Sequence, residues 1–147
     1  YIASTPIWIC IGAFLGLQLQ GTLYNYYYVI LRNKFDGDTT SRVFENKTPI
    51  ALPGEKQKHV NILFGMYKVL YGAFDKTIYT LDSKAHKGAA LPKWFMTSVS
   101  TFGLGFQLLL IATLLVLNLK SYILPFFLGY TLMVLVFIAI RKIFYKS

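Results

Sequence analysis

The chain has 147 residues, of which 55% are hydrophobic and 14% are charged, and its formal net charge is +9. This balance excludes an ordinary soluble domain and is typical of a small polytopic membrane protein, here a single membrane domain over residues 1–147. The basic residues flank apolar runs instead of forming a polar folded surface, which argues against a nucleic-acid partner.

The first predicted transmembrane helix covers about residues 6–31. Pro6 suits a first helical turn, and a tyrosine-rich segment followed by Arg32 and Lys34 marks the far membrane interface. The chain begins at Tyr1 rather than at Met, so we expect either a cleaved targeting peptide or a further N-terminal segment. The first of these would suit an organellar inner membrane.

Small and polar residues form two stripes on this first helix. One stripe contains Gly12, Gly16 and Gln20, and the other contains Gln18, Gly21 or Thr22, and Asn25. Polar side chains inside a transmembrane helix are costly unless they meet partners, so the helix is expected to pack against protein on two sides. These partners could belong to other subunits or to this chain itself.

A long loop over residues 33–93 contains all six acidic residues. Its first part is rich in turn-forming steps, and an amphipathic helix is expected over about 58–81. The polar stripe of that helix reads Lys58, Asn61, Gly65, Lys68, Gly72 and Asp75. The helix could lie in the membrane interface, which leaves three spans, or cross the bilayer as one helix of a four-span bundle.

The charge distribution favours three spans. If residues 58–81 stay outside the bilayer, every lysine and arginine except Lys120 lies on one side of the membrane. Basic residues concentrate on the inner side, so the loop 33–93 and the C-terminus are expected on the matrix side of a mitochondrial inner membrane. Lys68 and Asp75 would also be costly within a bilayer.

The last third of the chain predicts a transmembrane hairpin, with spans over about 94–119 and 122–140 and Lys120 at its tip. In the first of these spans, Thr101 and Gly105 lie on one side and suit close contact with another helix. The segment after Leu108 is almost uniformly apolar and suits lipid.

No catalytic or cofactor site is indicated. His59 and His86 are the only histidines and lack metal-ligand spacing, and Cys10 is the only cysteine. No carboxylate lies inside a confident span, which argues against an ion-coupled transporter.

The segment Lys58-His59-Val60-Asn61, which opens an apolar helix after a long loop, resembles the basic-x-His-x-Asn segment of the microsomal glutathione transferase family. The last apolar stretch, from 123 to 142, is similar in texture to the family's last helix. The resemblance implies a homotrimeric membrane enzyme that binds glutathione between subunits. The chain departs from the family pattern because the glutamate expected soon after Asn61 is absent. It also has no arginine between Arg42 and Arg141.

We therefore expect a non-catalytic accessory subunit of a multisubunit membrane complex, such as a respiratory or ATP synthase assembly of the mitochondrial inner membrane. The expected partners are other membrane subunits and phospholipids, including anionic lipids such as cardiolipin. The residues expected to make helix contacts are Gly12, Gly16, Gln20, Thr101 and Gly105, and those expected to contact lipid headgroups are Lys56, Lys58, Lys68 and Arg141. The alternatives are the glutathione transferase and a small oligomeric transporter or channel.

Overall fold

The computed structural model describes residues 5–34, 47–88 and 90–145, and this part of the chain is helical and contains no strand. The long helices are α1 (Ile7–Lys34), α2 (Gln57–Leu81), α3 (Lys93–Ser100), α4 (Leu104–Val116) and α5 (Ile123–Phe144). Two short 3-10 helices, η2 (Ala85–Lys87) and η3 (Lys120–Tyr122), connect them.

Two helical segments are long and apolar enough to cross a membrane. They are Ile7–Lys34 and Lys120–Phe144, and α3 and α4 together make a third if the bent pair counts as one span. For the described residues, the prediction of an all-helical fold with helices that could span a membrane is therefore confirmed. α2, which covers the expected amphipathic helix, is not among the candidate spans within the described residues.

The expected continuous helix over 94–119 is interrupted. α3 ends at Ser100 and α4 begins at Leu104, and the two axes are bent by 51°. Near the break, the hydroxyl of Thr101 donates a hydrogen bond to the carbonyl of Ser98 at 2.6 Å, and Gly103 is extended with φ −67° and ψ 148°. Hydroxyl groups that bond to nearby carbonyls compete with helical hydrogen bonds. Thr101, which was expected to form a packing face with Gly105, thus lies at a bend.

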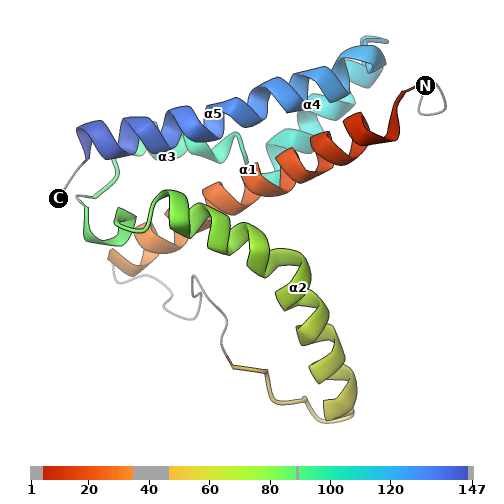
Figure 1. The fold of residues 1–147 in the computed structure, drawn as a ribbon, viewed down its shortest axis with the longest axis vertical. Helices are drawn as coiled ribbons and strands as arrows, with labels where there is room; N and C mark the ends of the chain where they lie inside the picture. The colour runs from red at the N-terminus through yellow and green to blue at the C-terminus, as the bar shows by residue number, and fades with distance from the viewer. Residues whose placement is uncertain (1–4, 35–46, 89, 146–147) are drawn as a thin grey trace.

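α1 and α5 lie side by side and run in the same direction (Figure 1). A side chain at Gly12 would meet Leu128, and one at Gly16 would overlap the hydroxyl of Thr131, so the small residues of α1 let the two backbones approach closely. The amide of Gln20 donates to the hydroxyl of Thr131 at 3.0 Å.

This polar contact extends to α4. The amide of Gln107 donates to the Gln20 side-chain carbonyl at 3.2 Å, and both side chains are buried. The contacts of the first stripe on α1 are therefore made inside this chain, which is the second of the two options that the sequence left open.

α2 has one packed half and one projecting half. Near its C-terminus Ile78 is fully buried in the core with Tyr27 and Phe95. Its N-terminal half leaves the bundle, as Figure 1 shows, and Leu63 there is 64% exposed. The end of α2, and not its beginning, is thus tied to the rest of the fold.

Candidate functional site at the basic end of the bundle

A buried polar cluster joins the ends of α1, α2 and α5. Asp82 is the C-terminal capping residue of α2, Arg141 lies in the last turn of α5, and Tyr26 and Tyr27 come from the second half of α1. Asp82 is 1% exposed and Arg141 is 4% exposed. Side chains from three helices therefore meet at one end of the bundle.

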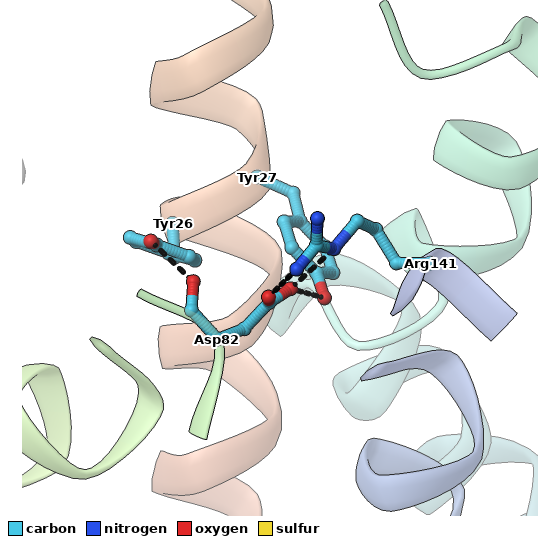
Figure 2. Close-up of polar contacts among 4 residues, drawn as sticks. All are labelled: Tyr26, Tyr27, Asp82 and Arg141. Atoms are coloured by element: carbon cyan, nitrogen blue, oxygen red, sulfur yellow. Dashed lines mark hydrogen bonds and ion pairs between the residues drawn. The ribbon is translucent and has the colours of Figure 1, made fainter. Parts of the chain in front are cut away.

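The Asp82 carboxylate is the centre of this cluster (Figure 2). Its Oδ2 atom accepts hydrogen bonds from Arg141 Nε and from the Tyr27 hydroxyl, both at 2.8 Å. Its Oδ1 atom forms an ion pair with Arg141 Nη2. The Tyr26 hydroxyl donates to the Asp82 backbone carbonyl at 2.8 Å. Two tyrosines of α1 thus hydrogen-bond to Asp82, Tyr27 to its side chain and Tyr26 to its backbone.

The cluster is suited to holding helices together. A buried charge is tolerated when it is paired and hydrogen-bonded, and here the guanidinium and one phenol satisfy the carboxylate. Arg141 was expected at a lipid headgroup, but the structure differs, because its guanidinium lies buried against Asp82. The reason is the return of the chain after α2, which brings Asp82 to the end of α5.

The segment after α2 closes over this pair. Lys34 Nζ, at the end of α1, donates to the carbonyl of Gly88. A side chain at Gly88 would come within 2.8 Å of the Tyr145 carbonyl and 3.4 Å of Arg141 Nη1. Only a residue without Cβ fits here, so Gly88 allows the segment to lie against Arg141.

A cavity of about 430 Å³ opens beside the ion pair. Its lining residues are Thr80, Leu81, Asp82, Ser83, Lys84, Arg141 and Lys142. Asp82 and Arg141 neutralise each other, so Lys84 and Lys142 leave the cavity with a net positive charge. The combination of ammonium groups and hydroxyls is suited to binding an anion.

The other residues expected at headgroups lie away from this cavity. Lys56 precedes α2, Lys58 lies in its first turn, and both are exposed. Lys68 is exposed in the middle of α2, with its Nζ atom 5.6 Å from the centre of the Phe64 ring.

Thr101 and Gly105, which were expected to make helix contacts from the second span, differ in whether they make them. The hydroxyl of Thr101 lies within hydrogen-bonding distance of the Tyr130 hydroxyl. A side chain at Gly105 would meet no atom within 4 Å in the described part of the chain. Thr101 therefore contacts α5, whereas Gly105 makes no close helix contact there.

Asp75 is a residue that the sequence reasoning assigned to an interfacial polar stripe. In the structure it lies with α1 residues of the second stripe in a cavity of about 270 Å³, lined by Gln18, Gly21, Thr22, Asn25, Tyr67, Tyr71 and Asp75. Burial raises the pKa of the Asp75 carboxyl. The sequence contains a signal for this contact, because α1 and α2 each carry a polar stripe and each stripe needs a polar neighbour.

Comparisons with protein families, with curated proteins and with solved structures gave no match to this chain. The resemblance to glutathione transferases thus gains no support, and Lys58, His59 and Asn61 are all exposed at the start of α2. Among the described residues, no group of three or more His, Cys, Asp or Glu side chains could hold a metal ion.

Proposed function

We propose that the chain is a non-catalytic accessory subunit of a multisubunit complex in the mitochondrial inner membrane, where it acts in assembly and stabilisation. The observation that supports this role is the projecting half of α2. Leu63, Met66 and Leu70 are 64%, 55% and 58% exposed there, and their spacing puts them on one side of the helix. We propose that a neighbouring membrane subunit covers this face.

The size and position of this face favour a protein partner. Burying the three side chains would contribute on the order of 5 kcal/mol, at about 1.5–3 kcal/mol for each fully buried side chain. Figure 1 shows the N-terminal half of α2 extending away from the other helices. The polar stripe with Lys58 and Lys68 lies on the other side of the helix, free to face phosphates or water.

The test is purification of the full chain from its source membrane in mild detergent. A large assembly that contains other proteins is expected, and a homotrimer that binds glutathione would overturn the proposal. Leu63→Glu with Leu70→Glu should lower incorporation into the assembly at least tenfold. Gly65→Glu is the matched control, because position 65 lies on the polar stripe and a side chain there meets no described atom within 4 Å.

A second candidate is a small oligomeric transporter, and the position of Asp75 favours it. A titratable carboxyl beside Thr22 and Asn25 lies against the middle of the first candidate span. Ionisable groups at such positions often mark ion or proton pathways. Reconstitution into vesicles would test this role, because a transporter should give a proton or cation flux that Asp75→Asn abolishes.

A further inference from the structure

The cavity beside Asp82 and Arg141 adjoins two further hollows along α2, and the three together are called the groove here. The cavity shares Thr80 and Leu81 with a second hollow of about 420 Å³, which Ala73, Lys76 and Thr77 also line. The second hollow shares Thr77 with a third, of about 370 Å³. Three hollows thus follow one another from the basic end towards the middle of the bundle.

The chemistry of this groove changes along its length. At one end lie Lys84 and Lys142, neither of which forms an ion pair within the part of the chain that the structure describes. At the other end the lining is mostly apolar and includes Phe74, Leu128 and Leu132. A ligand that fits both ends must have an anionic head and an apolar tail.

The length of the groove also fits such a ligand. Leu128 in the third hollow and Lys142 in the first are 14 residues apart on α5, which is about 21 Å at 1.5 Å per residue. Half of a bilayer, including its headgroup layer, measures about 20–22 Å. The groove therefore has the dimension of one lipid leaflet.

We propose that this groove binds one anionic phospholipid. The headgroup phosphate lies between Lys84 and Lys142, and an acyl chain follows Thr77 towards Leu128 and Leu132. The bound lipid must carry a net negative charge. Arg141 already neutralises Asp82, so the positive charges of Lys84 and Lys142 remain uncompensated. This inference rests on the membrane location in the proposed function but needs no partner subunit.

The test uses the full chain, purified in mild detergent with whatever subunits accompany it, and reconstituted in nanodiscs of phosphatidylcholine with one fifth phosphatidylglycerol. Mass spectrometry of the lipid retained after transfer to detergent counts phosphatidylglycerol per chain. Lys84→Gln with Lys142→Gln should lower that number at least fivefold. Lys47→Gln with Lys93→Gln removes the same charge from exposed positions that do not line the groove, and should leave the number unchanged.

Three results would overturn the proposal. One is an equal loss in both pairs of variants, which would indicate general attraction to the membrane surface. Another is full retention by Lys84→Gln with Lys142→Gln. The third is equal thermal stabilisation by inorganic phosphate and by phosphatidylglycerol, which would indicate a free-anion site.

Thr77→Phe, which fills the apolar path, should also lower the retention of phosphatidylglycerol while both lysines remain. If no other subunit co-purifies, the accessory role fails independently of these lipid counts.

Discussion

Asp82 and Arg141 form a buried ion pair that connects the end of α2 to the end of α5, across 59 residues of sequence. Without this pair, the contacts between the C-terminal half of α2 and the bundle would be mainly those on α1. The pair therefore adds a contact with α5 at the point where the chain leaves α2.

Removal of Arg141 should be strongly destabilising. Arg141→Met leaves the Asp82 carboxylate buried without its cation, which costs about 3–5 kcal/mol in comparable pairs. The free energy of unfolding, measured in mixed detergent micelles, should fall by about 3 kcal/mol. Lys142→Met is the matched control, because Lys142 is exposed and should change stability by less than about 0.5 kcal/mol.

A double variant tests whether the cost of Arg141→Met comes from leaving the Asp82 carboxylate unpaired. Asp82→Leu with Arg141→Met removes both charges together, and buried ion pairs replaced by apolar residues often retain stability. The double variant should therefore be more stable than Arg141→Met alone. If it is less stable, the cost does not come from an unpaired carboxylate.

The close approach of α1 and α5 predicts opposite effects at two glycines. A side chain at Gly16 would overlap Thr131, so Gly16→Ala should lower the free energy of unfolding by about 1–3 kcal/mol. A side chain at Gly21 would meet no described atom within 4 Å, so Gly21→Ala should raise it by up to about 1 kcal/mol through helix propensity. Thermal melts of both variants in one detergent would measure this difference. Equal shifts in melting temperature for Gly16→Ala and Gly21→Ala would contradict the prediction.

The raised pKa of Asp75 predicts a pH dependence of stability. The folded chain holds this proton more tightly than the unfolded chain does. The stabilisation is therefore complete below the ordinary carboxyl pKa of about 3.9, and it is lost as the pH rises through the raised pKa. Asp75→Asn should melt at a higher temperature than the parent at pH 7.5, and the difference should narrow towards pH 4.

The exposed carboxylate of Glu55 supplies the control for this measurement. Glu55→Gln removes one negative charge outside the cavity between α1 and α2, so its melting temperature should follow the parent across the same pH range. A pH-dependent difference of the same size in both variants would mean that overall charge, and not burial of Asp75, is responsible.

The side of the membrane on which α2 lies can be tested by labelling. In a Cys10→Ser background, Lys47→Cys and Lys87→Cys should react with an impermeant maleimide from the same side, and Ser121→Cys from the opposite side. Reaction of Lys47→Cys and Lys87→Cys from opposite sides would mean that α2 crosses the bilayer, as in the four-span alternative.

The sequence predicted the helices more fully than their contacts. Gly16 and Gln20 were recognisable as packing residues because their spacing puts them on one helix face, but spacing cannot tell whether the facing helix belongs to the same chain. Here Thr131 and Gln107 supply the contacts from within it.

Arg141 illustrates the other limit. An arginine that follows an apolar run is usually found at the membrane interface, and nothing near it in the sequence suggested a carboxylate partner. Asp82 reaches it only because α2 packs back on α1, a contact that depends on the whole fold. The sequence did not indicate the positive cavity beside the pair for the same reason, because Lys84 and Lys142 line one cavity only once that contact exists.

The break between α3 and α4 has a consequence for the surrounding bilayer. α4 has 13 residues and is therefore about 20 Å long, shorter than the roughly 30 Å hydrocarbon core. If α3 and α4 form one span, their 51° bend makes the pair reach less far along the membrane normal than a straight helix with the same number of residues. Such hydrophobic mismatch is relieved by tilting the helices or thinning the lipid. Acyl-chain length is therefore expected to influence this hairpin, with shorter-chain lipids matching it best.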